Sequence, residues 1–308
     1  MNKTGFSDEA AIFVRVVERG GFAAAAEGTG LTPSGVSRSV TRLEDRLGVR
    51  LLQRTTRRLA LTPEGETMLA RGRAILAAIE AAEAEVTAAR GRPRGLLRVN
   101  TGTAFARHRL VPRLAEFRVR YPEVTLELSV NDRRVDLMAE QIDIAIRTGR
   151  VDDSSLIART LETDHRVICA SPAYLARRGT PVTPEDLARH DCLVLHGFSR
   201  LAEWPFLQGG RVAQRSITPA MTCDSVEVLR DMTLAGLGIV RLAGFLLRDA
   251  LEEGRLVPLL AAHHVPEPVP ITALMPPGRQ HLPRVRALLD LLTEGRPTPP
   301  GAANAPGG

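Results

Sequence analysis

The sequence predicts an α/β protein built in three consecutive parts: a mostly helical N-terminal region, one long helix, and an α/β region. Residues 7–61 read as short helical segments that end in an arginine-rich stretch. Residues 63–89 read as one helix, and RGRPRG at 90–95 then breaks the pattern with a proline and two glycines. From Leu96 onward, short β-branched runs alternate with helical runs, which is typical of α/β domains. The 308 residues suffice for about two domains.

The segment TPSGVSRSVTRLEDRL (32–47) has the start signals and the periodicity of an amphipathic helix. Thr32 can cap the free N–H groups of the first turn, and Pro33 suits the first helical position. Four apolar residues recur at spacings of four, three and four, which predicts one narrow buried stripe: Val36, Val40, Leu43 and Leu47.

The opposite face of this helix is expected to read DNA. Ser34, Arg38 and Arg42 lie away from the apolar stripe, and small residues such as Ser37 keep the first turn slim. An arginine there can donate two hydrogen bonds to guanine O6 and N7 in a major groove. The alanine-rich segment 22–27, followed by glycines at 28 and 30, completes a helix-turn-helix pattern.

A small hairpin, or wing, is expected next, in RLLQRTTRRLALT (50–62), with arginines at its tip that can contact phosphates or enter the minor groove. Arg46 and Arg50 are expected instead to pair with neighbouring acids such as Glu44 and Asp45. The candidate DNA-contacting residues are therefore Thr32, Pro33, Ser34, Ser37, Arg38, Arg42, Arg54, Thr55, Arg57 and Arg58.

The long helix repeats the capping pattern with Thr62 and Pro63 and then carries a heptad-like apolar seam: Met68, Gly72, Ile75, Ile79, Ala82 and Val86. Such a narrow seam is expected to pair with a second copy of the chain. Packing of the seam against its own domain is the alternative. Pairing would place two DNA-reading helices about one DNA turn apart, as a palindromic site requires.

The α/β region is expected to contain mostly parallel strands. Its strand-like runs are 96–100, 124–130, 142–146, 165–170, 192–195, 256–260 and 269–275. Its helical runs are 109–121, 183–190, 225–236 and 283–292.

Composition narrows the functional classes. The net charge is +6, and seven arginines stand against two acids between residues 38 and 58, which favours a polyanionic partner. The sequence shows no signal-peptide or membrane-spanning pattern, and its three scattered cysteines have no metal-ligand spacing, so a cytoplasmic protein is expected. Cys169 and Cys192 lie in apolar strand contexts, which favours buried core thiols over a redox pair. No catalytic motif, cofactor site or metal site is expected.

From Phe13 to Gly65 the chain resembles the LysR-type transcriptional regulators. The matching pieces are FVRVVERGGFAAAA and GLTPSGVSRSVTRLEDRLGVRLLQRTTRRLALTPEG. The resemblance implies a winged helix-turn-helix, with the motif proper at 21–40, and a linker-helix dimer, often assembled into a tetramer. The chain departs from the family at Gly28 and Thr29, where a polar and a large apolar residue are usual.

Residues 96–294 resemble the family's effector-binding domain, which is similar to periplasmic solute-binding proteins with two α/β lobes. The matching pieces are IDIAIRTGRVDDSSLIARTL, CASPAYLARRGTP, GLGIVRLAGFL and EGRLVPLL. The expected divisions are a DNA-binding domain at 1–62, a linker helix at 63–90, an effector domain at 91–295 and a disordered tail at 296–308. Lobe I is expected at about 96–159 and 269–295, and lobe II at about 160–268.

Polar residues at strand and helix ends of this region are the candidate effector contacts: Thr101, Thr103, Arg147, Asp224 and Ser225. Helix N-termini and an arginine can hold a carboxylate, so a small anionic metabolite between the lobes is expected. The alternative is that these residues only cap helices. The sequence therefore predicts a transcription regulator that binds promoter DNA and a small effector. An enzyme, a redox sensor and a plain solute-binding protein are the other classes considered.

Overall fold

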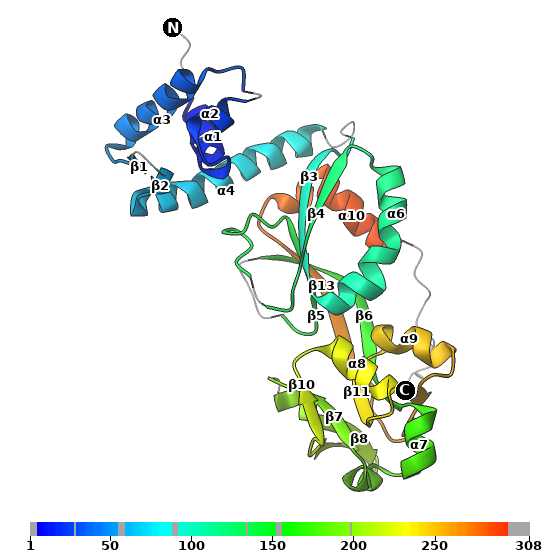
Figure 1. The fold of residues 1–308 in the computed structure, drawn as a ribbon. Coiled ribbons are helices and arrows are strands. Elements are labelled where there is room, and N and C mark those ends of the chain that lie inside the picture. The colour runs from blue at the N-terminus through cyan, green and yellow to red at the C-terminus, as the bar shows by residue number, and fades with distance from the viewer. Residues whose placement is uncertain are drawn as a thin grey trace.

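A computed structural model describes most of the chain (Figure 1). Its described residues are 5–27, 29–54, 59–87, 92–133, 135–151, 156–197 and 199–294. The tail expected to be disordered, 296–308, lies outside them. Within these ranges no helix combines the length and apolarity needed to span a bilayer, and no cluster of His, Cys, Asp and Glu is placed to hold a metal.

The N-terminal unit packs three helices against one small core. These are α1 (Phe6–Glu18), α2 (Phe22–Ala26) and α3 (Pro33–Leu47). The predicted stripe of α3 is buried at Val36, Val40 and Leu43, but Leu47 is 40% exposed, so the stripe ends one turn earlier than expected. The helix stops at Gly48, whose left-handed backbone (φ 71°) suits glycine.

A two-stranded hairpin follows α3, as the sequence predicts. Strand β1 (Leu52–Arg54) pairs antiparallel with β2 (Leu59–Leu61), and Leu52 lies opposite Leu61. The tip of the wing, with Thr55, Arg57 and Arg58, lies outside the described residues.

The linker helix α4 (Pro63–Thr87) is joined closely to the hairpin. The Thr62 hydroxyl accepts a hydrogen bond from the Gly65 N–H, which confirms the predicted cap. A Cβ at Gly65 would lie 2.0 Å from the Leu51 carbonyl oxygen, so only glycine allows this approach. The first part of the predicted seam packs within its own domain: Met68 is buried in the N-terminal core, and Gly72 lies against Val14 of α1.

The remainder of the chain forms two α/β lobes, and one continuous sheet runs through both of them. Among the described residues, nine strands join in one sheet, in the order β10-β7-β11-β6-β13-β5-β3-β4, with β12 beside β6. The first lobe contains β3 (Gly95–Thr101), β4 (Val124–Val130) and β5 (Ile144–Thr148). Its helical elements are α5 (Thr103–Phe105), the π-helical turn η1 (Ala106–Leu110), α6 (Val111–Arg120), η4 (Arg279–His281) and α10 (Pro283–Thr293).

The second lobe follows the same alternation. Its strands are β7 (Cys192–Leu195), β10 (Met221–Cys223), β11 (Ile239–Ala243) and β12 (Val257–Pro258). Its helices are α7 (Pro172–Arg178), the 3-10 helices η2 (Pro184–Arg189) and η3 (Ser199–Ala202), α8 (Val226–Leu234) and α9 (Gly244–Glu252). A separate hairpin joins β8 (Glu203–Gln208) to β9 (Arg211–Ser216).

Two long strands run between the lobes (Figure 1). Strand β6 (Ile157–Ala170) pairs along its first part with β13 (Pro268–Met275) and along its last part with β11 and β12. All of these pairings, and that of β13 with β5, are antiparallel. The expected parallel pairing is present within each lobe, where β3 pairs with β4 and β5, and β7 pairs with β10 and β11. It fails for the connecting strands β6 and β13, which run against their neighbours.

Several predicted boundaries also shift. The strand expected at 142–146 begins at Ile144, and the one expected at 256–260 is reduced to Val257–Pro258. The helix expected at 183–190 is a 3-10 helix. The β8–β9 hairpin was not predicted, because its strands lack the continuous apolar runs that mark the buried strands.

Candidate DNA-binding and effector sites

The candidate DNA-contacting residues of α3 share one exposed face. Thr32, Pro33, Ser34 and Arg38 are exposed, and Ser37 is half-buried. The Thr32 hydroxyl accepts from the Gly35 N–H at 3.2 Å, which confirms the predicted cap. The first turn of α3 therefore presents hydroxyl groups to solvent, and the guanidinium of Arg38 follows in the next turn.

Two arginines of α3 are held by a carboxylate that sequence reasoning missed. Glu9 of α1 is buried (2% exposed), and its two oxygens lie 3.4 Å from Arg42 and 3.2 Å from Arg46. Arg42, a candidate DNA contact, thus also ties α3 to α1. The partner of Arg46 differs from the neighbouring acids expected, because Glu9 is distant in sequence and reaches it only through the packing of the two helices.

The base of the wing is fixed by Glu44. Its Oε1 accepts from the Leu51 N–H at 2.8 Å and from the Leu52 N–H at 3.2 Å, and its Oε2 pairs with Arg50 at 2.8 Å. Burial raises the pKa of this carboxyl, but the three donors outweigh burial and leave the pKa below its ordinary value. The predicted internal pairing of Arg50 is confirmed. Nothing is described of the Arg54 side chain, at the end of β1.

The loop that carries Thr101 and Thr103 already holds a carboxylate. Thr101 is fully buried, whereas Thr103 is exposed at the start of α5. The Thr103 N–H donates to Asp132 Oδ1 at 3.3 Å, and a Cβ at Gly102 would lie 2.5 Å from the same oxygen. The helix start expected to bind an anion is therefore occupied by an anionic side chain of the protein, Asp132.

The candidates from the second lobe lie at the start of α8. Asp224 is exposed, and the Ser225 hydroxyl caps α8 by accepting from the Val228 N–H at 3.4 Å. In the first turn of α8, buried Glu227 lies 3.3 Å from Arg107 and 3.0 Å from His108, both in η1 of the first lobe. This contact brings the Thr103 and Ser225 ends of the two lobes to the same junction.

Arg147 is the third candidate from the first lobe. It lies on β5, half-buried, and its guanidinium donates to the Asn100 side-chain oxygen on the neighbouring strand β3. Asn100 is itself fully buried and donates to Ser129. The side chain of Arg147 is therefore held within the first lobe, close to the end of β3 that leads to Thr101.

The two cysteines with apolar neighbours are buried, as the sequence indicates. Desolvation raises the pKa of Cys169 to about 12. Desolvation, with a smaller effect of Asp191, raises the pKa of Cys192 to about 12. Both remain protonated thiols at neutral pH, and a thiol is a poor nucleophile.

Comparison with known proteins finds two family models that match this chain. Residues 8–66 match the family model for bacterial regulatory helix-turn-helix proteins of the lysR family. Residues 90–297 match the model for the LysR substrate binding domain.

Named relatives cover nearly the whole chain. The HTH-type transcriptional regulator CrgA of Neisseria meningitidis serogroup B is 41% identical over 288 residues, covering 94% of this chain and 96% of the relative. An HTH-type transcriptional repressor of Pseudomonas aeruginosa is 37% identical over 92% of this chain and 90% of the relative.

Solved structures agree. The structure of CrgA aligns with a TM-score of 0.63 at 41% identity, over 95% of this chain and 99% of that one. The full-length Vibrio cholerae virulence activator AphB aligns with a TM-score of 0.56 at 28% identity. The alignment covers 92% of this chain and 97% of AphB. The exposed α3 face, the wing and the two-lobed domain thus belong to one known arrangement, and this chain is a member of the LysR family of DNA-binding transcriptional regulators.

Proposed function

We propose that this regulator reads promoter DNA with the first turns of α3, and that Arg38 supplies the main base contact. The exposed face formed by Thr32, Ser34 and Arg38 is the observation that carries the proposal. A helix with a slim polar first turn can enter a major groove closely, and the arginine can then reach a guanine edge. Thr55, Arg57 and Arg58 of the wing, with Arg54, are assigned to the DNA backbone or the minor groove.

The test is a binding measurement on the DNA upstream of the regulator's own coding sequence, at two salt concentrations. Arg38→Ala is expected to cost about 1–3 kcal/mol at one base pair and to relax the preference there. Arg57→Ala is expected to weaken all sequences alike and to reduce the salt dependence. Arg118→Ala, an exposed arginine on α6, is the matched control. Unchanged base discrimination in Arg38→Ala would overturn the assignment.

The effector is proposed to be a small anionic metabolite bound where the two lobes meet. Thr103 begins α5 and Ser225 caps α8, whose Glu227 contacts the first lobe. The Thr103 N–H already donates to a carboxylate. A ligand carboxylate would replace Asp132 there, with Thr101, Arg147 and Asp224 shaping the surroundings. Because Arg107, His108 and Glu227 join the lobes at this junction, ligand entry would change how the lobes meet.

A thermal-stability screen of small carboxylates tests this site. A stabilising ligand is expected to lose its effect in Thr103→Ala and in Arg147→Ala, and to keep it in Arg118→Ala. Full retention of the effect in both site variants would remove the proposal.

Self-association through α4 completes the proposal. Ile75 and Ile79 of the predicted seam are 37% and 39% exposed and lie one turn apart on the same helix face. Pairing of two chains along α4, with further assembly into a tetramer, would bury them and place two α3 helices on one DNA. A repressor and an activator both occur among the similar proteins, so the family is compatible with either sign of regulation.

A further inference from the structure

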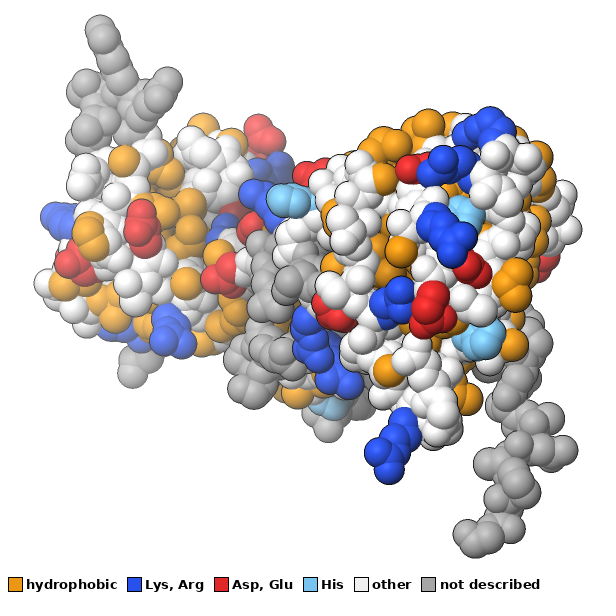
Figure 2. Space-filling view, turned by 90° about the horizontal axis from the view of Figure 1, so that it is seen from below, with side chains coloured by type: hydrophobic (Ala, Val, Ile, Leu, Met, Phe, Trp, Pro, Cys, Tyr) orange, Lys and Arg blue, Asp and Glu red, His pale blue; other side chains and the backbone are white. Residues whose placement is uncertain are grey.

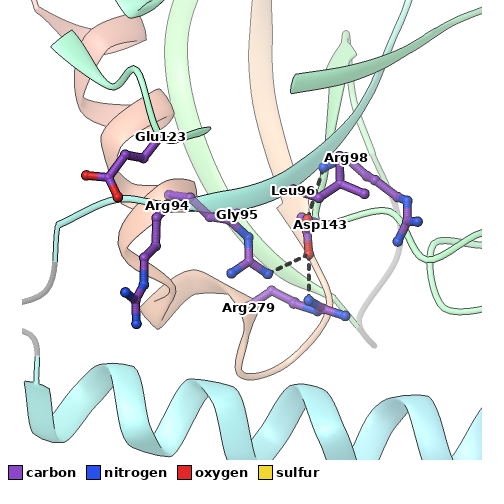
Figure 3. Close-up of a pocket in the computed structure, with 8 residues that line it drawn as sticks. Arg94, Gly95, Leu96, Arg98, Glu123, Asp143 and Arg279 are labelled. Atoms are coloured by element: carbon purple, nitrogen blue, oxygen red, sulfur yellow. Dashed lines mark hydrogen bonds and ion pairs between the residues drawn. The ribbon is translucent and has the colours of Figure 1, made fainter. Parts of the chain in front are cut away.

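The first lobe contains a cavity of about 520 Å³ away from the junction of the lobes, beside the linker helix α4 (Figure 3). It lies at the start of β3, opposite the strand end that leads to Thr101 and Thr103. Its volume is within the range of pockets that hold small molecules. Its lining residues are Arg94, Gly95, Leu96, Arg98, Glu123, Asp143, Arg279 and Arg284.

The lining is strongly cationic. Four arginines face only two acids, Glu123 and Asp143. These arginines come from different parts of the first lobe and the linker. Arg98 lies on β3, Arg279 on η4 and Arg284 on α10. Arg94 lies in the segment that leads from α4 into β3. An arrangement of guanidinium groups around one hollow can donate several charge-assisted hydrogen bonds to a single oxyanion.

Asp143 is the internal anion of this cavity. It is almost fully buried, and its Oδ1 lies 2.7 Å from Arg279 and 3.9 Å from Arg284. Its Oδ2 accepts from the Arg98 N–H at 3.0 Å. One buried carboxylate thus holds two guanidinium groups in place, so these two are oriented before any ligand arrives.

The other two arginines lie nearer to solvent. Arg98 is 31% exposed and has a long ion pair of 3.5 Å with Glu127, itself 61% exposed. Arg94 is exposed, and within the described part of the chain no carboxylate lies within ion-pair distance of it. In Figure 3 Arg94 and Arg98 lie on opposite sides of Asp143, so both edges of the cavity carry a cation.

We propose that this cavity is a second anion-binding site, which takes a small multivalent oxyanion such as a polycarboxylate or a phosphate. Arg94 and Arg98 bind the anion at the rim, and Arg279 and Arg284 provide the positive potential behind it. The molecular face in Figure 2 shows acidic and basic side chains interspersed with apolar ones. The proposal is independent of the effector site between the lobes.

The experiment uses the full-length chain with citrate and inorganic phosphate as probes, each compared with sodium chloride at equal ionic strength. Binding is measured by calorimetry and by the thermal unfolding midpoint. Citrate, phosphate or both are expected to raise the midpoint beyond the effect of chloride, and the comparison of the two shows which oxyanion class fits. The double variant Arg94→Ala/Arg98→Gln is expected to raise the dissociation constant about tenfold or more, because one or two charge-assisted hydrogen bonds to the anion are lost.

Two control variants make the result specific. Arg118→Ala removes one exposed arginine elsewhere in the same lobe, and Thr103→Ala alters the proposed effector site. Both are expected to bind the probe as the wild type does. The inference is overturned if neither anion stabilises the wild type beyond chloride, if the double variant retains full affinity, or if Thr103→Ala weakens binding instead.

Discussion

At the residue scale, single buried carboxylates fix the DNA-reading unit. Glu9 holds α3 against α1 through Arg42 and Arg46, and Glu44 holds the first residues of the wing. Both side chains are almost fully buried among cations and N–H donors. Residues that read as surface charges in the sequence thus connect the elements of this small domain.

Glu44 allows a direct test. Glu44→Ala leaves the buried Leu51 and Leu52 N–H groups without this acceptor, and is expected to cost about 1–3 kcal/mol of unfolding free energy. Glu44→Gln keeps one acceptor oxygen and is expected to cost about 1 kcal/mol. Chemical denaturation measures both, with Glu64→Gln, an exposed residue of α4, as the control. Because the pKa of Glu44 is lowered, its contribution is present above pH 4.5 and is lost as the pH falls through the folded-state pKa. Equal stability of Glu44→Ala and the wild type would contradict this role.

His264 predicts a pH dependence for the second lobe. Desolvation, assisted by Arg241, lowers its pKa from 6.5 to about 4, although Glu267 acts in the opposite sense. Its Nε2 lies 3.0 Å from Arg241 Nε, which is consistent with a neutral ring that accepts a hydrogen bond. Between pH 6.5 and 4 the unfolded chain therefore binds more protons at this residue, and stability falls as the pH falls.

The corresponding measurement is a series of denaturation curves from pH 7 to pH 4. His264→Gln, which keeps an acceptor for Arg241, is expected to flatten the acid slope relative to the wild type. Arg118→Ala, at an exposed arginine that does not titrate in this range, is expected to leave the slope unchanged. Identical slopes in all three proteins would mean that His264 does not titrate as described.

At the element scale, the apolar seam of α4 divides into a buried part and an exposed part. Its first turns pack against α1 through Met68 and Gly72, while Ile75 and Ile79 remain exposed on the continuing seam. Packing within its own domain, the alternative considered from the sequence, therefore holds for the first part of the seam. Pairing with a second copy stays a prediction for the exposed part. The regular spacing of apolar residues in a sequence identifies an apolar stripe on a helix, but it does not identify the surface that covers the stripe.

Ile79→Glu tests the exposed part. Burying an isoleucine contributes about 1.5–3 kcal/mol, so a charge at the seam is expected to weaken self-association at least about tenfold. Sedimentation equilibrium over a range of protein concentrations measures the change. Ala70→Glu adds the same charge on the opposite face of α4 and is expected to leave association unaltered. If both variants associate like the wild type, the seam is not the contact.

The sequence predicted the elements with strong local signals and missed those decided by distant contacts. The Thr32 and Thr62 caps and the leucine-bearing hairpin strands are local patterns, and all are present. The link between Glu9 and Arg46 and the antiparallel course of β6 and β13 depend on how remote segments meet, so no local pattern reveals them. The carboxylate of Asp132 at Thr103 was missed for the same reason.

At the scale of the whole molecule, a small polar contact joins the DNA-reading unit to the first lobe. Glu18 at the end of α1 accepts from Arg73 of α4 at 3.3 Å and from the Gln141 side chain at 2.5 Å. Arg73 also donates to the Ala139 carbonyl oxygen at 3.3 Å. Gln141 has a left-handed backbone (φ 55°), which is costly for a residue other than glycine, so the loop is held in a particular shape at this contact.

Glu18→Ala is expected to loosen this contact without unfolding either domain. Partly exposed ion pairs are worth about 0.2–1 kcal/mol, so amide hydrogen exchange around residues 138–142 is expected to accelerate by a factor of about 1.4 to 5. Mass-spectrometric exchange measures this, with Glu64→Ala as the control. An unchanged exchange rate would show that the contact does not hold the loop.

The close joint at Gly65 has a consequence for operator geometry. Because the wing lies directly against the start of α4, a rotation of α4 about its axis turns the recognition surface with it. In two chains paired along α4, the rigid linker helix would therefore set how the two DNA-reading units are rotated relative to each other. Inserting one residue into α4 before Ile75 would rotate the reading unit by about 100° and move it about 1.5 Å relative to the pairing seam. The two reading units could then no longer face their half-sites on the same side of the duplex at the same time. Each unit alone could still bind its own half-site.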